Sequence, residues 1–395
     1  MSISRSVGLS LATAIMLGGT ALSMAHAAPF MIVGNDEKVL WDDAGKTVLK
    51  PAGKDSVLIV DLANPEKPKI VATLPLDNSV IGPPVNVDID PTGSVALVSD
   101  SVDVAKDEAK GGDALKINLD NKIYVIDLKA KPAKLAATIT GGKQPSGLSF
   151  SPDGKMALVA NRGDNSISVL SVNGTDVKVT DTIAMGDSVA HVTFAPDGKH
   201  AYAVKFTTHK LSVLDIANGK VTYNKLDLAA GLWPYNVAVT PNGQLAMTAD
   251  NGNAGASDGS VDTVSVFDLT LNPPRAIDRV VVGDGPEGFA ISPKGNLAAA
   301  AILRGSNAAK DAFFRKKNGS VAVLRIDGKK VSKTQDIEVG GLPEAVVFTP
   351  DGKYILVGNY LDQDFSILKV NGTKVKDTGK RFKVPGHPAS ARMSH

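Results

Sequence analysis

The chain has 395 residues, 43% of them apolar and 21% charged, so it can bury a large core and belongs to the globular class. Its 43 basic and 41 acidic side chains nearly cancel, which argues against nucleic acid or an anionic membrane as a partner recruited by charge. The absence of cysteine excludes a disulfide framework, covalently attached c-type haem and thiolate metal sites.

Residues 1–27 have the pattern of an export signal. Arg5 supplies a positive start, Val7 to Leu22 is apolar, and Ala25-His26-Ala27 is a small-x-small cleavage site. The mature domain is therefore expected to cover residues 28–395. No later stretch reaches the roughly 20 apolar residues of a membrane span. We expect a monomer without a membrane span, exported to the periplasm, with secretion beyond it left open.

One phrase recurs along the mature chain: Pro, five or six alternating residues, and then Pro-x-Gly. The clearest copy runs from Pro145 through Leu148 and Phe150 to Pro152-Asp153-Gly154. Six copies occur, and their turn prolines are 44 to 61 residues apart. Each interval contains short alternating or β-branched segments, for example 156–160, 166–172 and 177–183, so each unit is predicted to be a four-stranded sheet.

A seventh copy is split between the two ends of the chain. Pro388 to Ser394 repeats the inner-strand phrase, and Phe30 to Asn35 matches Tyr354 to Asn359 of the last complete copy. A blade built from both ends closes the ring and leaves no open sheet edge. The sequence therefore predicts an all-β fold, a seven-bladed β-propeller closed by pairing of the C-terminal strand with the N-terminal blade.

The segment from Leu158 to Leu170 resembles the YVTN-type β-propeller repeat, in which a strand ends in Asn, a loop follows, and a strand of the Val-Ser-Val-Ile-Asp kind begins. The resemblance covers essentially the whole mature chain. It implies the propeller fold and relatives that include lactonase-like propellers, small periplasmic propellers and redox enzymes. The chain differs from the redox members because it lacks cysteines and a partner domain.

The predicted connections between strands differ between the two faces of the disk. Short turns such as Asn218-Gly219 and Asn371-Gly372 lie on one face. The other face is expected to hold four long insertions, which are Glu37 to Asp55, Ser101 to Asn121, Asn251 to Asp262 and Arg304 to Asn318. Long loops on one face of a rigid scaffold commonly build a binding site, so we expect a polar funnel there, although such insertions are also tolerated without function.

Alignment of the repeats predicts which residues line this funnel. Positions equivalent to Asn161, at the ends of second strands, are Asn35, Asp100, Lys205, Asp250, Ile302 and Asn359. Positions at the starts of inner strands are Asn86, His191, Tyr235, Asn236, Glu287, Glu344 and Ser390. Arg162, Trp233, Arg304 and Tyr360 in adjoining loops complete the expected ligand contacts. A solvated channel mouth would also need polar groups.

Two functions stay open at this point. The first is a non-enzymatic propeller that binds a small polar molecule or an envelope protein through the funnel. In this case Phe313-Phe314, within the basic segment Lys310 to Lys317, is a candidate docking point. No cofactor is predicted for it.

The alternative is a lactonase-like hydrolase or isomerase. Asp100, Asp250, Glu287 and Glu344 would hold a divalent cation such as calcium, and His191, Glu287 or Glu344 would move protons.

Overall fold

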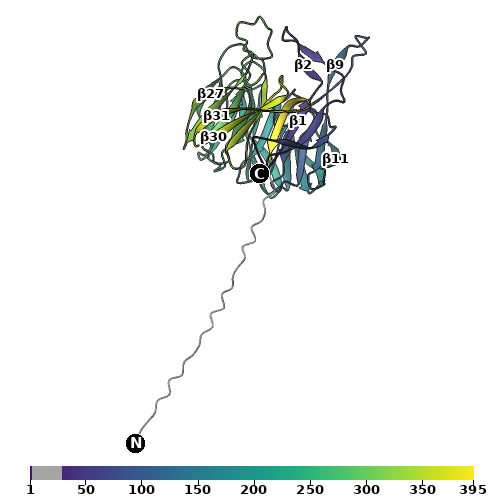
Figure 1. The fold of residues 1–395 in the computed structure, drawn as a ribbon. Coiled ribbons are helices and arrows are strands. Elements are labelled where there is room, and N and C mark those ends of the chain that lie inside the picture. The colour runs from purple at the N-terminus through teal and green to yellow at the C-terminus, as the bar shows by residue number, and fades with distance from the viewer. Residues whose placement is uncertain (2–28) are drawn as a thin grey trace.

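The computed structural model describes Met1 and residues 29–395, so the predicted export signal lies, apart from Met1, outside the described residues. Seven four-stranded antiparallel sheets are arranged around one axis, and this confirms the predicted seven-bladed β-propeller (Figure 1). Within the described part of the chain, no helix is long and apolar enough to cross a membrane.

In six blades the strands are ordered from the axis outward in chain order, and in the closing blade β32 is innermost, followed by β1, β4 and β5. The inner strands are β6 (Val87–Ile89), β12 (Pro145–Phe150), β16 (Val189–Phe194), β20 (Pro234–Val239), β24 (Pro286–Ile291), β28 (Pro343–Phe348) and β32 (His387–Met393). The second strands are β7 (Val95–Ser99), β13 (Met156–Asn161), β17 (His200–Lys205), β21 (Leu245–Asp250), β25 (Leu297–Ile302), β29 (Tyr354–Asn359) and β1 (Phe30–Asp36).

The outer half of each blade is formed by its third and fourth strands. The third strands are β10 (Lys122–Asp127), β14 (Ser166–Asn173), β18 (Lys210–Ala217), β22 (Asp262–Asp268), β26 (Ser320–Asp327), β30 (Asp364–Asn371) and β4 (Ser56–Asp61). The fourth strands are β11 (Lys134–Thr140), β15 (Asp176–Ala184), β19 (Lys220–Ala229), β23 (Arg275–Gly283), β27 (Lys330–Glu338), β31 (Lys374–Lys383) and β5 (Lys69–Leu74). The segments expected at 156–160, 166–172 and 177–183 correspond to β13, β14 and β15.

The ring closes where the two ends of the chain meet. Strand β32 pairs antiparallel with β1, with Met31 opposite Met393. The backbone N–H of Phe30 donates to Ser394 Oγ at 3.1 Å, and the N–H of Ser394 donates to the Phe30 carbonyl at 2.9 Å. The closing blade therefore contains strands from both ends of the chain, as the split seventh repeat predicted.

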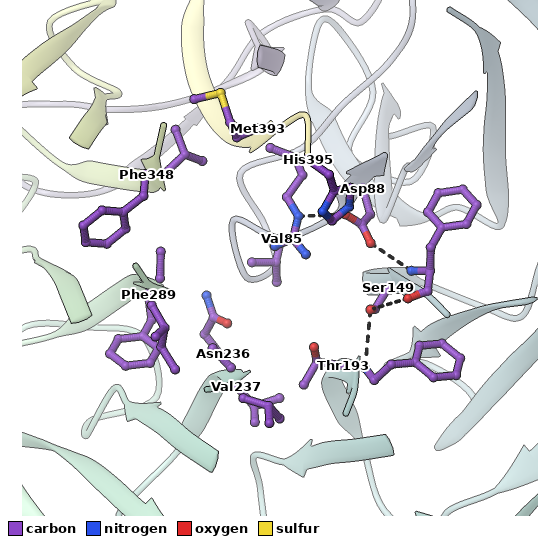
Figure 2. A pocket seen from close by; sticks show the side chains of 18 of the residues that line it. Val85, Asp88, Ser149, Thr193, Asn236, Val237, Phe289, Phe348, Met393 and His395 are labelled. Carbon is purple, nitrogen blue, oxygen red and sulfur yellow. Dashed lines mark hydrogen bonds and ion pairs between the residues drawn. The ribbon is translucent and has the colours of Figure 1, made fainter. Parts of the chain in front are cut away.

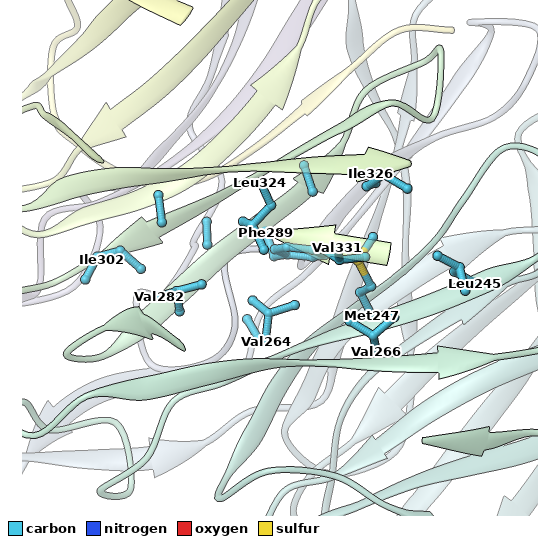
Figure 3. Packing of buried hydrophobic residues seen from close by; sticks show 14 residues of the cluster. Leu245, Met247, Val264, Val266, Val282, Phe289, Ile302, Leu324, Ile326 and Val331 are labelled. Atoms are coloured by element: carbon cyan, nitrogen blue, oxygen red, sulfur yellow. The ribbon is translucent and has the colours of Figure 1, made fainter. Parts of the chain in front are cut away.

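Apolar side chains between neighbouring blades form the core. In one such cluster Met247 and Val264 from one blade pack against Phe289 and Leu324 of the next (Figure 3). The inner and second strands are buried on both faces, whereas the fourth strands are mostly exposed. The core thus lies between sheets, and the inner strands are left to surround the axis.

The Pro-x-Gly turns are shaped by glycine. Six glycines join inner to second strands with φ between 64° and 69°, a range in which a side chain would be strained; they are Gly93, Gly154, Gly198, Gly243, Gly295 and Gly352. We call the side of the disk on which they lie the turn-bearing face.

The opposite side is the loop-bearing face, because all four long insertions join a second strand to a third. Two of them fold into hairpins, β2 (Val39–Trp41) with β3 (Thr47–Leu49) and β8 (Val102–Lys106) with β9 (Leu115–Leu119). Figure 1 shows β2 and β9 projecting from the end of the body opposite the C-terminus. The insertions are on one face, as expected.

Candidate functional site

Residues at the ends of the second strands point outward into their own blades rather than toward the axis. Asn161 Nδ2 donates to Ser166 Oγ at 3.0 Å and to Ser168 Oγ at 2.9 Å, both on the third strand of the same blade. Asn359 makes the equivalent bond to Ser366, and Asn35 bonds Ser56. These amides hydrogen-bond the second strand to the third, a structural role that the sequence analysis did not assign to them.

The charged residues at equivalent positions behave in the same way. Lys205 Nζ lies 3.3 Å from Asp227 Oδ2 on the outermost strand of its blade. Asp250 accepts hydrogen bonds from Thr248, Thr263 and Ser265, and burial nevertheless raises its pKa to about 6. Asp100 is fully buried, and desolvation raises its pKa well above the ordinary range. Ile302 is part of the core between blades.

Three of the predicted loop contacts also have structural partners. The Tyr360 hydroxyl donates to the Val39 carbonyl at 2.6 Å, beneath the β2–β3 hairpin. The Arg304 guanidinium lies 3.5 Å from Glu338 Oε2 on an outer strand. The Trp233 ring packs edge-on against Phe206, with a centroid distance of 4.9 Å. Of the three, only Trp233 belongs to the surroundings of the axial residues described next.

A set of polar side chains converges where the inner strands begin on the loop-bearing face. Tyr235 on β20, Glu287 on β24 and Glu344 on β28 occupy matching positions on three successive inner strands and are 7%, 6% and 5% exposed. The strands β24 and β28 approach closely at Gly288, where a Cβ would overlap the Glu344 carbonyl oxygen. Glycine at this position therefore brings the two glutamates together.

Arg162 reaches this group from the loop that follows β13. Its guanidinium carbon lies 5.0 Å from the centre of the Phe206 ring and 5.5 Å from that of Tyr235, so two aromatic rings position it. Its charge favours ionisation of Glu287. We call Arg162, Tyr235, Glu287 and Glu344 the axial cluster.

The two glutamates of the axial cluster bind protons unusually tightly. Burial raises the pKa of Glu287 to about 8, although Asn251 Nδ2 donates to its Oε1 at 2.8 Å and Arg162 opposes the shift. Burial, and then the charge of Glu287, raise the pKa of Glu344 well above its usual range. Because the pKa of Glu287 is about 8, this carboxyl becomes a proton acceptor as the pH approaches 8, while Glu344 keeps its proton and can act as a donor.

Several polar atoms close to the axial cluster are buried without a hydrogen-bond partner among the described residues. They include Glu287 Oε2, Nε and Nη1 of Arg162, and Ser146 Oγ. Asn86, which directly precedes β6, and Ser390 on β32 also have a buried atom without a partner. Buried polar atoms are nearly always paired with protein or ordered water, so this region is built to hold a polar molecule or water.

The surroundings of His191 do not favour the expected role in proton transfer. It is 3% exposed, its Nδ1 accepts the Val237 N–H at 3.2 Å, and burial together with the Arg392 charge lowers its pKa to about 3. The ring is therefore neutral at pH 7. His191 lies on β16, closer to the turn-bearing face than the axial cluster. A neutral imidazole tied to the backbone is a poor proton acceptor.

We predict that the His191 ring stays uncharged from pH 8 down to about pH 4, because its pKa is depressed to about 3. Since unfolding releases it to an ordinary pKa near 6.5, its contribution to stability falls as the pH drops below that value. Ring ¹⁵N chemical shifts measured against pH test this, with His191→Asn identifying the signal. Titration of that signal between pH 6 and 7 would contradict the depressed pKa of His191.

The four carboxylates proposed as a metal site do not come together. Asp250 bonds to Thr263 and Ser265 on the third strand of its blade, and the charges that act on Asp100 come from residues outside the axial cluster. Of the four, only Glu287 and Glu344 act on each other. Within residues 29–395, no three side chains of the His, Cys, Asp and Glu types gather closely enough to hold a metal ion. The expected four-carboxylate cluster is therefore corrected to a pair.

Sequence reasoning did not predict Asn251, Asp88 or Arg392 as site residues. Arg392 Nε, on the inner strand β32, donates to Asp88 Oδ1 at 2.7 Å on the neighbouring inner strand β6. Both residues lie two positions after the predicted inner-strand sites, and side chains two apart in a strand share a face. That periodicity could have identified them. They line a cavity of about 640 Å³ near the turn-bearing face, opposite the predicted funnel (Figure 2).

Comparisons with known proteins agree with this fold. A sequence model of the family described as Lactonase, 7-bladed beta-propeller matches residues 119–188. No curated protein sequence matches the chain. A candidate 6-phosphogluconolactonase from Bacteroides uniformis superposes with a TM-score of 0.70 at 15% identity, over 92% of this chain and 99% of that chain.

Two further solved structures are similar. A candidate 6-phosphogluconolactonase from Bacteroides fragilis has a TM-score of 0.69 and 18% identity, over 94% of this chain and 99% of that chain. The periplasmic gluconolactonase of Pseudomonas aeruginosa has a TM-score of 0.67 and 15% identity, over 93% and 99%. At these identities the likeness concerns architecture: the chain has the seven-bladed β-propeller fold that these proteins share.

Proposed function

We propose that this protein binds a small, neutral sugar lactone at the axial cluster and hydrolyses it. The observation that supports this most directly is the meeting of Glu287, Glu344 and Arg162 on the axis, with raised carboxyl pKa values and buried polar atoms that lack partners. The names of the similar structures, which include a gluconolactonase, agree with this chemistry.

The residues of the cluster divide the reaction between them. Glu287, whose carboxyl is the weaker proton binder, takes a proton from water as the water oxygen attacks the lactone carbonyl carbon. Arg162 stabilises the negative charge that forms on the carbonyl oxygen. The bond to the ring oxygen then breaks, and Glu344 donates its proton to that oxygen. The product is the open hydroxy acid.

The charge balance at the site supports a neutral substrate. Arg162 is the cation that acts on Glu287, and two carboxyl groups lie beside it. A phosphorylated lactone would bring two negative charges into a buried site that offers Arg162 as its cation and would oppose ionisation of Glu287, which is unfavourable without additional cations. We therefore propose the unphosphorylated lactone as the better substrate.

We also propose that the protein works in the periplasm as a monomer, exported by the signal in residues 1–27. A second candidate function is docking of an envelope protein on the loop-bearing face. Phe313 favours it, since this side chain is 90% exposed and Lys316 and Lys317 follow closely in sequence.

We expect Arg162→Gln to lower kcat/KM for lactone hydrolysis about 100-fold, because a donor to the developing oxyanion is lost. Hydrolysis of glucono-1,5-lactone by the mature chain is followed by proton release, with the spontaneous rate subtracted. Arg304→Gln, on the same face but paired with Glu338, is the matched control and should keep full activity.

The assay separates the candidate functions. Lactone binding by calorimetry without turnover would leave a binding protein and overturn the hydrolase proposal. Full activity in Arg162→Gln would overturn the assigned site. Absence of both binding and turnover with neutral lactones would overturn the whole proposal.

A further inference from the structure

A second cavity lies near the turn-bearing face, separate from the axial cluster and beyond the proposed hydrolysis. It has a volume of about 640 Å³, within the range of small-ligand pockets, and it is surrounded by the inner strands. Figure 2 shows Asn236, Val237, Phe289, Phe348 and Met393 around its interior. We call it the turn-face pocket.

One side of the turn-face pocket is apolar. Val237, Phe289, Phe348 and Met393 are between 1% and 8% exposed, and they contribute to this wall. Burial of apolar ligand surface against such a wall contributes about 25 cal/mol per Å². The pocket is therefore suited to a ligand with an apolar body.

Two polar groups in the turn-face pocket lack full partners. Asn236 is 1% exposed, and its side chain lies at the pocket wall in Figure 2. Its amide is near enough to His191 to raise the pKa of that ring, but neither amide atom makes a hydrogen bond of good geometry with a described residue. Arg392 Nε donates to Asp88, and its two terminal nitrogens donate to no other described residue. A buried amide without partners is costly, so a ligand or water is expected to pair with it.

Asp88 positions the Arg392 guanidinium and does not compete for the ligand. One of its oxygens accepts from Arg392 Nε at 2.7 Å, and the other accepts the Phe150 N–H at 2.8 Å. A guanidinium that is bound through Nε leaves Nη1 and Nη2 available to donate two hydrogen bonds to a carboxylate. His395 is exposed at the pocket mouth, so the field of its terminal carboxylate is weakened by solvent.

We propose that the turn-face pocket binds a small organic monocarboxylate with an apolar body. The carboxylate pairs with the terminal nitrogens of Arg392 or the Asn236 amide, and the apolar body contacts Val237, Phe289 and Phe348. This site shares no residue with the axial cluster, so it can exist whether or not the protein hydrolyses lactones.

Isothermal titration calorimetry of the full mature chain tests the proposal, with octanoate as the probe and octanamide as its neutral match. We expect octanoate to bind at least about tenfold more tightly than octanamide, since a charge-assisted hydrogen bond is worth roughly 1.5–3 kcal/mol. The double variant Asp88→Asn/Arg392→Gln removes both charges together and should abolish that preference. Ala238→Phe, which adds bulk inside the pocket, should weaken both ligands.

The matched control is Arg325→Gln/Asp327→Asn, an exposed pair of the same kind at 3.1 Å on β26, which should keep the tenfold preference. Thermal melts establish that each variant is folded. Equal binding of the two ligands by the unaltered protein, no octanoate binding up to millimolar concentration, or a preference that survives in the Asp88/Arg392 variant would each overturn the proposal.

Discussion

Glu344→Gln is expected to stabilise the protein at alkaline pH and to abolish lactone hydrolysis. Burial raises the pKa of this carboxyl well above its unfolded value. Such a group contributes its full stability below the unfolded pKa near 4.5 and loses it as the pH rises toward the folded pKa, by about 1.4 kcal/mol per pH unit. Glutamine keeps the shape of the protonated side chain without this loss.

The stability gain from Glu344→Gln should therefore be clearly larger at pH 8 than at pH 5. Urea unfolding at the two pH values measures it. Glu338→Gln, an exposed carboxyl on β27, is the control and should give the same stability difference at both. A gain that does not depend on pH would contradict the buried, protonated state, and retained hydrolysis would contradict its role as proton donor.

Removal of residues 387–395 is expected to destroy the cooperative unfolding transition. The deletion takes away β32, exposes the edge of β1, and removes Ala391 and Met393 from a core cluster that also contains Met31 and Val33. An open ring with an unpaired strand loses both ladder hydrogen bonds and apolar burial. Urea denaturation followed by circular dichroism measures this: we expect a gradual loss of signal in place of the sigmoidal transition of the intact chain.

A circular permutant is the sharpest control for this deletion. It joins His395 to Phe30 through a short linker and opens the chain at the exposed turn Asn371-Gly372, so that every strand is kept. This permutant should unfold cooperatively near the original midpoint. Cooperative unfolding of the truncated chain at an unchanged midpoint would show that closure by β32 is dispensable.

The propeller was predictable because its determinants are local. Each Pro-x-Gly turn marks one blade, period-two alternation marks its strands, and the copy split between Phe30 and Pro388 marks ring closure. None of these patterns depends on which side chains meet across the axis.

The site was less predictable, because side-chain direction depends on features that alternation does not reveal. Inner strands are bulged where they begin, for example between Pro234 and Asn236 and between Pro286 and Phe289. A bulge changes which residues face the axis, and one-residue differences exchange the faces of a strand. The repeat alignment placed Glu287 and Glu344 together, and the structure has them close enough to interact, whereas Asn161 and Lys205 bond to the outer strands of their own blades.

Both described ends of the chain lie on the turn-bearing face, since Phe30 bonds to Ser394 beside the turn-face pocket. Any affinity tag or surface linkage attached there stands at the mouth of that pocket. A protein immobilised through either end would present the axial cluster to the solution and would block the mouth of the turn-face pocket. Sensor measurements would then report on only one of the two sites. Attachment at an exposed fourth-strand lysine such as Lys376 would leave both accessible.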